Sequence, residues 1–411
     1  MNSYPTVKGG CRLSVLGVIL IILAVFTLIM FGLELLRSRY VLNVTHNVIT
    51  LDSLPDNFDG TKMVVISDLH QMRFGEYNEL LAKKIKIEEP DYIFFVGDMG
   101  DSKKYNVDAF YDLLETLGRD IPFIMVPGNH DLRLGGGKVH KNFLREISNA
   151  GAVLLDNACA EMKAGDDKLY IYGFSQPLNP QKDVDIKYWD TAPVTDAFIS
   201  GTLGKCPSDA PVILLAHDPT YFGCYSNWGA DLVLSGHMHG GLIRLPFVGG
   251  LFSPTKKAFP KYTSGSYSIN DSKLYVTRGL GTSTFTRFGN PPEISVLTLT
   301  QPNSRIFAES QQNNKPVIDM PKESLKDWAK SEWSSFKSLI QERSNQVSDF
   351  FSEMFGKKKS RFSKEAYRRK KRNTYTAAKA AKRMPKEEKH IEEDKPYIYT
   401  KDKNSKNIKR K

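Results

Sequence analysis

Polar side chains recur directly after short apolar segments in this chain, and this pattern constrains the fold more than any other feature. The apolar segments have the length of β-strands and cover residues 63–66, 92–96, 123–126, 212–215 and 232–234. The polar groups that follow them are Asp68-Leu69-His70, Asp98 to Asp101, Asn129-His130-Asp131, His217-Asp218 and His237-Met238-His239. Ligand sites of α/β proteins form at the carboxyl ends of sheet strands. The pattern therefore predicts one site built from several strand ends.

The spacing of apolar residues predicts the class of fold. Helix-like stretches at 77–88 and 107–117 separate the first strands, and further strand-like segments follow at 153–155, 169–172, 274–277 and 294–299. Alternation of strands and helices is typical of sheets covered by helices. We expect an α/β body over residues 61–300.

Histidines are concentrated in the polar motifs. The chain has 8 histidines, and five of them lie in the motifs, whereas His46, His140 and His390 lie elsewhere and are expected at the surface. Carboxylates and imidazoles that converge on one rim repel each other or lack partners unless a cation joins them. The composition of the motifs therefore predicts a pair of divalent metal ions.

Taken in order, D-x-H, G-D-x-x-D, G-N-H-D, H-D and G-H-x-H resemble the motifs of the calcineurin-like metallophosphoesterase superfamily over about residues 62–300. The stretches 245–262 and 278–283 are similar to bacterial membrane-anchored members, some of which cleave the pyrophosphate of UDP-2,3-diacylglucosamine. Leu242 departs from that subgroup, where Gln is expected. The resemblance implies a double β-sheet sandwich flanked by helices.

The resemblance also implies a role for each motif residue. Two sets of three side chains would bind the two cations, namely Asp68, His70 and His239 for one and Asn129, His217 and His237 for the other. Asp98 would bridge them. His130 would lie beside the leaving group, positioned by Asp101, although a structural hydrogen bond or a plain turn is the alternative for this pair.

The implied mechanism is in-line attack on phosphorus. Two metal ions would hold a bridging hydroxide, and His130 would protonate the departing oxygen. Mn²⁺, Fe and Zn²⁺ all suit a site of mixed Asp, His and Asn ligands.

A membrane anchor is predicted near the start of the chain. Residues 13–33 carry no charge and are bounded by Arg12 and Glu34, after a stub at 1–12. As a helix they would span roughly 30 Å, the thickness of the hydrocarbon core of a bilayer. Because a cleavable signal has a shorter apolar core and a small-x-small site, we expect an uncleaved single-pass anchor in the cell membrane, followed by a connector at 34–60. Basic residues flank both ends, so the orientation stays open.

The formal net charge of +11 comes from the end of the chain. Residues 301–411 hold 29 basic and 15 acidic residues, whereas residues 1–300 have a net charge of −3. We expect a linker and an amphipathic helix over 301–356, and a disordered basic tail over 357–411. Anionic lipid or a surface polyanion would be the partner of this tail.

Together these features favour a membrane-anchored metal-dependent phosphoric ester hydrolase, acting on a phosphodiester or pyrophosphate bond of a small or lipid-linked substrate. A phosphoprotein phosphatase is the alternative enzyme, but the signature G-D-x-x-D-R-G is absent because Ser102-Lys103 follows Asp101. A tethered polyanion-binding protein is the alternative outside enzymes. Two features stay open: residues 242–262 form either a substrate lid or a loop on the sheet, and Arg278 and Arg287 contact either phosphate or surface acids.

Overall fold

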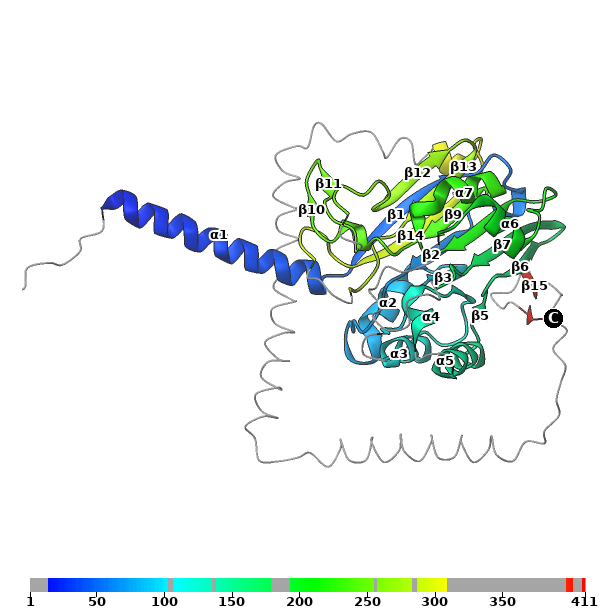
Figure 1. Cartoon of the computed structure of the whole chain (residues 1–411), viewed down its shortest axis with the longest axis horizontal. Helices are drawn as coiled ribbons and strands as arrows, with labels where there is room; N and C mark the ends of the chain where they lie inside the picture. Colours follow the sequence, from blue (N-terminus) through cyan, green and yellow to red (C-terminus); the bar gives the residue numbers. More distant parts are fainter. Residues whose placement is uncertain are drawn as a thin grey trace, which may run out of the picture. The chain divides into compact units, whose positions relative to one another are not determined.

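The computed structural model describes residues 14–102, 106–134, 138–178, 193–254, 257–282, 287–308, 397–401 and 409–410 (Figure 1). Two β-sheets form the body of the described chain. Helices lie against the outer face of each sheet, so that the expected sandwich flanked by helices is confirmed.

The first sheet runs in the order β1-β14-β2-β3-β4-β5. Its strands are β1 (Asn43–Thr50), β14 (Glu293–Thr300), β2 (Lys62–Ile66), β3 (Tyr92–Val96), β4 (Phe123–Val126) and β5 (Val153–Leu154). From β2 to β5 all neighbours are parallel. The carboxyl ends of β2, β3 and β4 therefore meet at one edge of this sheet.

The second sheet runs in the order β12-β13-β9-β8-β7-β6-β15-β16. Its strands are β12 (Gly265–Ile269), β13 (Ser272–Val276), β9 (Leu232–Ser235), β8 (Val212–Ala216), β7 (Asp167–Phe174), β6 (Ala158–Ala164), β15 (Tyr397–Lys401) and β16 (Lys409–Arg410). The neighbours β7, β8, β9 and β13 are parallel. A small hairpin of β10 (Arg244–Leu245) and β11 (Gly249–Gly250) stands apart from both sheets.

The central strands alternate their side chains between two apolar cores. In β2, Met63 and Val65 face the core between the sheets, whereas Val64 and Ile66 face the helical layer. The strand β8 repeats this alternation, with Ile213 in the inter-sheet core. Strands buried on both faces read as continuous apolar runs, which is why the sequence revealed them.

The helices of the body are short. They are α2 (Glu79–Ile87), α3 (Asp108–Leu117), α4 (Asn129–Arg133), α5 (Lys138–Asn149), α6 (Asp196–Leu203) and α7 (Phe222–Trp228), with 3₁₀ turns η1 (Asp56–Phe58), η2 (Glu76–Asn78), η3 (Pro219–Tyr221) and η4 (His239–Gly241). Residues of α2, α3 and α5 pack against the first sheet, and residues of α6 and α7 pack against the second.

The helix α1 (Val15–Tyr40) precedes the body. Its most apolar window has a mean hydropathy of 3.0 and is not buried in the protein, so its length and composition suffice to cross a membrane. The hydroxyl of Ser14 accepts a hydrogen bond from the Gly17 N–H and caps the first turn.

The segment 34–60, expected to be a connector, instead belongs to the fold. The helix continues to Tyr40, and β1 then pairs with β14 along its whole length. This strand lies at the edge of the sheet and mixes polar with β-branched residues, so it lacks the apolar run that marks central strands. The strands β6 and β12 also lacked such a run.

The C-terminal predictions fall mostly outside the described residues. The amphipathic helix predicted within 301–356 lies there, and so does most of the tail at 357–411. Within that tail, β15 pairs with β6 and β16 pairs with β15, so these two short segments are strands rather than disordered chain.

Candidate metal centre

The five polar motifs meet where β2, β3 and β4 of one sheet and β8 and β9 of the other end. Ligand atoms in each of three groups lie within 4.8 Å of one another: Asp68, His70 and His239; His70, Asp98 and His130; and Asp98, His217 and His237. All of these residues are buried except His237, which is partly exposed. Seven of the predicted site residues therefore share one centre.

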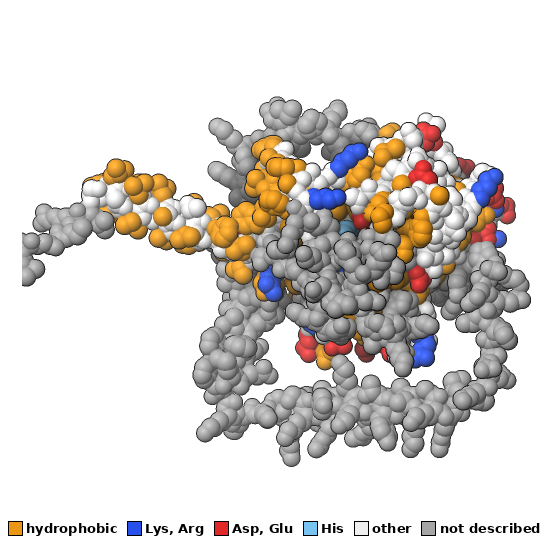
Figure 2. Space-filling model, viewed as in Figure 1, with side chains coloured by type: hydrophobic (Ala, Val, Ile, Leu, Met, Phe, Trp, Pro, Cys, Tyr) orange, Lys and Arg blue, Asp and Glu red, His pale blue; other side chains and the backbone are white. Residues whose placement is uncertain are grey.

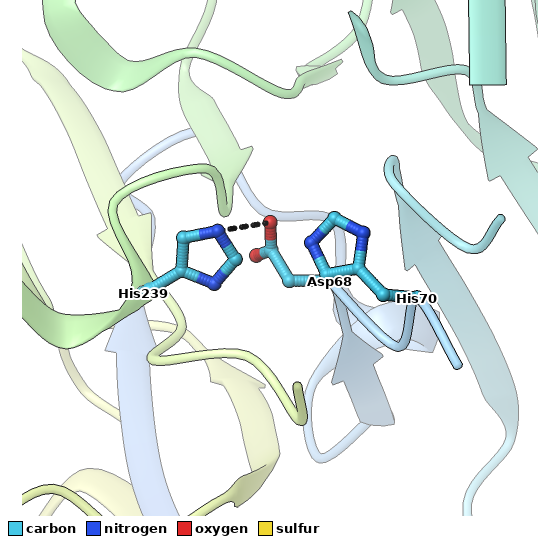
Figure 3. Close-up of side chains that lie close together, drawn as sticks. All are labelled: Asp68, His70 and His239. Atoms are coloured by element: carbon cyan, nitrogen blue, oxygen red, sulfur yellow. Dashed lines mark ion pairs between the residues drawn. The ribbon is translucent and has the colours of Figure 1, made fainter. Parts of the chain in front are cut away.

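The first group lies between the ends of β2 and β9 (Figure 3). The rings of His70 and His239 have centroids 5.4 Å apart, and the Asp68 carboxylate lies beside them. The distance from His239 Nε2 to Asp68 Oδ1 is 3.6 Å. An atom in this space would meet one carboxylate oxygen and two ring nitrogens.

The second group surrounds Asp98, at the end of β3. His217 Nε2 lies 3.1 Å from Asp98 Oδ2, and the ring of His237 is 5.0 Å from that of His217. The other carboxylate oxygen, Asp98 Oδ1, accepts a 2.7 Å hydrogen bond from the His130 backbone N–H. Asn129 precedes His130 at the start of α4, so its segment lies against Asp98.

Three histidine rings are oriented by backbone carbonyl groups. The Nδ1 atoms contact Gly100 O at 3.3 Å for His70, Val96 O at 2.7 Å for His217 and Gly281 O at 2.9 Å for His239. A carbonyl oxygen only accepts, so each Nδ1 carries the hydrogen and each Nε2 of a neutral ring keeps its lone pair. Histidines that bind metals are held in this way.

Several acceptor atoms of the centre lack partners within the described part of the chain. Asp68 Oδ1, His70 Nε2 and Asn129 Oδ1 are buried and make no hydrogen bond there. Buried acceptors without a donor are costly, and bound cations would satisfy them. This donor set of carboxylate, imidazole and amide groups fits first-row divalent metals.

Burial and neighbouring charges shift the pKa values of these groups in opposite directions. Burial and, next in size, the adjacent His130 ring together lower the pKa of His70 to about 3. Burial also disfavours charge on His217, but the Asp98 carboxylate raises its pKa to about 10. Burial would raise the pKa of Asp98, yet His217 holds it well below its usual range. Asp98 and His217 thus form an ion pair in the metal-free protein.

His130 differs from the other histidines of the centre. Its Nδ1 accepts a 3.3 Å hydrogen bond from the Ser102 backbone N–H, which places the proton of a neutral ring on Nε2. Asp101 Oδ1 lies 3.6 Å from the same Nδ1. The ring is therefore set to donate from Nε2, and the Asp101 carboxylate would stabilise its protonated form.

The backbone of the centre is strained. Asp68, His70, Asp98, His237 and His239 have φ values of 55°, 51°, 57°, 65° and 47°, a region that side chains other than glycine rarely adopt. Such strain collects at functional sites. Two glycines let the backbone come close: a Cβ on Gly128 would lie 2.3 Å from Asp98 Oδ1, and one on Gly236 would lie 1.8 Å from Ser67 Oγ.

Two buried residues, Asn290 and Arg287, support the centre from behind, and sequence reasoning missed Asn290. The side chain of Asn290 donates a 2.6 Å hydrogen bond to the His239 carbonyl, and Arg287 Nη1 donates to Gly279 O at 2.9 Å. Both lie outside the motifs. Arg287 is not a surface residue, since its exposed fraction is 3%, and Arg278 pairs with the buried Glu293 at 2.9 Å.

Asp131 connects the loops of the centre. Its two carboxylate oxygens accept hydrogen bonds from Gly128 N at 3.0 Å and from Gly100 N at 2.8 Å. Because both oxygens are taken up by backbone N–H groups, Asp131 holds these loops together and does not offer a free ligand atom.

Residues 61–241 match the model of the calcineurin-like phosphoesterase family. An uncharacterized metallophosphoesterase of Bacillus subtilis, YkuE, is 30% identical over 66% of this chain and 91% of its own length. The phosphodiesterase YaeI of Escherichia coli is 27% identical over 59% of this chain and 84% of its own. The UDP-2,3-diacylglucosamine pyrophosphatase LpxG of Chlamydia trachomatis is 25% identical over 60% of this chain and 86% of its own length.

The family match covers all five motifs. The matched residues include the ends of β2, β3, β4, β8 and β9, where the buried acceptors converge. The chain belongs to the calcineurin-like metallophosphoesterase family and is a metal-dependent phosphoester hydrolase.

Proposed function

We propose that this protein is a membrane-anchored hydrolase of phosphodiester or pyrophosphate bonds that holds two divalent metal ions. The observation that carries the proposal is the set of buried, unpartnered acceptors at the strand ends of the described chain. Relatives named as a phosphodiesterase and a pyrophosphatase support the choice of bond.

The residues of the centre divide into two proposed ligand sets. Asp68, His70 and His239 would hold one ion, because their ligand atoms lie within 4.8 Å of one another. Asn129, His217 and His237 would hold the other. Asp98 lies in groups with His70 and with His217, so its carboxylate would bridge the two ions.

When bound, the ions would supply Lewis acidity toward the phosphoryl oxygens and activate a water molecule as nucleophile. The chain's own residues would do the remaining work. Asp98 would keep the ions together, and its contact with the His130 N–H would keep that histidine at the edge of the centre. The imidazolium form of His130, stabilised by the Asp101 carboxylate beside Nδ1, would donate its Nε2 proton to the departing oxygen and so become a neutral ring.

The membrane anchor is part of the proposal. The helix α1 is long and apolar enough to span a bilayer, and its exposed surface carries large apolar side chains such as Leu16, Leu28 and Phe31. A single pass of this helix would keep the hydrolase at the membrane surface, where small or lipid-linked phosphate esters are both accessible.

Hydrolysis of bis(p-nitrophenyl) phosphate tests the proposed activity. The full-length protein in detergent should turn over this diester when Mn²⁺ is added after chelation. Asp98→Asn should lower the rate at least 1,000-fold, about 4 kcal/mol of activation free energy. Asp209→Asn, a change at an exposed carboxylate, should leave the rate unaltered.

Two further measurements complete the test. Phosphopeptides should be poor substrates, whereas preferential phosphopeptide hydrolysis would favour a phosphoprotein phosphatase. Folded, metal-loaded protein that is inactive on phosphodiesters, pyrophosphates and monoesters would contradict the proposal. Flotation of the full chain with lipid vesicles, lost when residues 14–33 are deleted, tests the anchor separately.

A further inference from the structure

Large apolar side chains are exposed together on the hairpin β10–β11 and the turn that follows it. We call this region the apolar tip, and its residues are Leu245, Phe247, Val248, Phe252 and Phe259. Phe247 is 109% exposed and Phe259 is 71% exposed. The two turns are joined by a 2.8 Å hydrogen bond from Phe259 N to Leu251 O. Figure 2 shows hydrophobic side chains gathered at the place of β10 and β11.

The conformation of Phe247 is unfavourable for a protein that meets only water. Its φ of 64° is rare for a residue with a Cβ, and its ring is fully exposed. Strained backbone and exposed aromatic rings are retained where a surface has a partner.

The apolar tip is connected to α1 through Phe288. The backbone of Phe288 donates to Leu242 O at 3.2 Å and accepts from Arg244 N at 2.9 Å, directly before the tip. Its ring stacks on Phe31 of α1, with centroids 5.1 Å apart. The next residue, Gly289, donates a 3.1 Å hydrogen bond to the Glu34 carboxylate.

These contacts place the tip near the end of the uncharged stretch. The uncharged stretch ends at Leu33, and Phe31 precedes Leu33 by about 3 Å along the helix axis. Phe247 follows Arg244 by three residues, a span of at most about 10 Å of extended chain. If α1 crosses a bilayer, the apolar tip therefore lies at the boundary between hydrocarbon and headgroups.

The charge around the tip fits an anionic lipid surface. Residues 242–262 contain four basic residues and no acidic one. Lys257 and Lys261 are exposed. Aromatic side chains beside exposed lysines are typical of surfaces that insert into the headgroup region of anionic membranes.

We propose that the apolar tip inserts into the surface of the bilayer that α1 crosses, with Lys257 and Lys261 on anionic headgroups. This inference rests on the membrane anchor of the proposed function. The tip is also joined to the metal centre, because Phe252 N donates to Gly241 O at 3.3 Å, two residues after His239. Insertion would present the centre to phosphate esters held in that bilayer surface.

Tryptophan fluorescence tests the insertion in the full-length protein, reconstituted in vesicles of phosphatidylcholine and phosphatidylglycerol. Phe247→Trp adds a reporter at the tip, and Phe198→Trp on α6 is a matched control, since Phe198 is also exposed, at 38%. The emission of each variant is taken as its difference from the wild type. With acyl-chain-brominated lipid we expect the added emission at position 247 to fall at least twofold, and that at 198 to stay unchanged.

Equal emission with and without brominated lipid at position 247 would overturn the inference. Flotation with the vesicles and diester hydrolysis are measured on the same samples. If the protein floats and hydrolyses the diester but the emission at position 247 is not quenched, only the insertion of the apolar tip is refuted. A chain that does not float refutes the anchor and the tip together, and quenching without hydrolysis supports the tip while contradicting the proposed activity.

Discussion

The hydroxyl of Ser38, near the end of α1, accepts a 3.1 Å hydrogen bond from the backbone N–H of Asn290. The Asn290 side chain in turn donates to the His239 carbonyl at 2.6 Å. Both residues are fully buried, with exposed fractions of 0%. The end of α1 is therefore connected to a candidate metal ligand by two hydrogen bonds.

Removal of the Asn290 side chain should weaken metal binding. In Asn290→Ala the His239 carbonyl loses its donor, so the loop that carries the imidazole is less firmly held. Loss of a supporting contact of this kind lowers metal affinity about 10–100-fold. We expect the Mn²⁺ concentration for half-maximal diester hydrolysis to rise by that factor.

Asn227→Ala serves as the control, because Asn227 donates to Asp196 at the surface, away from the centre. Unaltered Mn²⁺ dependence in a folded Asn290→Ala protein, as judged by its melting temperature, would show that the contact does not support the ligand.

His130 should matter most when the leaving group is poor. A departing alkoxide needs a proton, whereas p-nitrophenolate leaves without one, so the rate loss depends on the pKa of the leaving group. We expect His130→Gln to lower kcat about 100- to 10,000-fold for alkyl diesters and far less for p-nitrophenyl esters. Rates across a series of leaving groups, with metal content measured alongside, provide the test.

Asp101→Asn should show the same dependence on the leaving group with a smaller amplitude, since Asp101 acts through the His130 ring. A uniform loss over all leaving groups would assign His130 to binding instead of proton donation.

Metal removal should destabilise the folded protein. Without ions the centre keeps buried acceptors that no described group satisfies, and a ligand that binds only the folded state adds about 2.7 kcal/mol at 100 times its Kd. We expect chelation to lower the melting temperature by several degrees and Mn²⁺ to restore it. In Asp98→Asn the shift should be much smaller, and an equal shift there would locate the ions elsewhere.

The fold was largely predictable because its central strands are buried on both faces. Val64 and Val65 face different cores, so β2 reads as an unbroken apolar run, and the polar motif after it marks its end. The edge strand β1 has no such run, and its pairing with β14 depends on residues about 250 positions away. Local patterns carry no information on such pairing.

The candidate site was predictable only where chemistry and spacing coincide. The motif Asp68-Leu69-His70 is recognisable in the sequence because a carboxylate and an imidazole follow directly after a predicted strand. Asn290 and Arg287 have no motif, and they reach the centre only because the loop before β14 folds back on it. The positive φ values at Asp68 and Asp98 could not be predicted from the sequence either, because glycine is the residue that indicates such a conformation.

Glu293 should make stability depend on pH. This buried residue, at the start of β14, accepts hydrogen bonds from Arg278 N at 2.7 Å, from Arg278 Nη2 at 2.9 Å and from Thr45 Oγ1 at 3.0 Å. Burial alone would raise the pKa of Glu293, but the charge and hydrogen bonds of Arg278 lower it. A lowered pKa in the folded state stabilises the protein above the unfolded value of 4.5, and this contribution is lost as pH falls through the folded value.

Glu293→Gln should therefore cost about 1.5–3 kcal/mol at pH 7, the range for hydrogen bonds to charged groups, and progressively less below pH 4.5. Urea unfolding at pH 7 and below pH 4.5 measures the difference in the free energy of unfolding between this variant and the wild type. Glu115→Gln, at an exposed position of α3, should cost little at either pH. A pH-independent loss in Glu293→Gln would mean that the residue contributes through its shape and not through its charge.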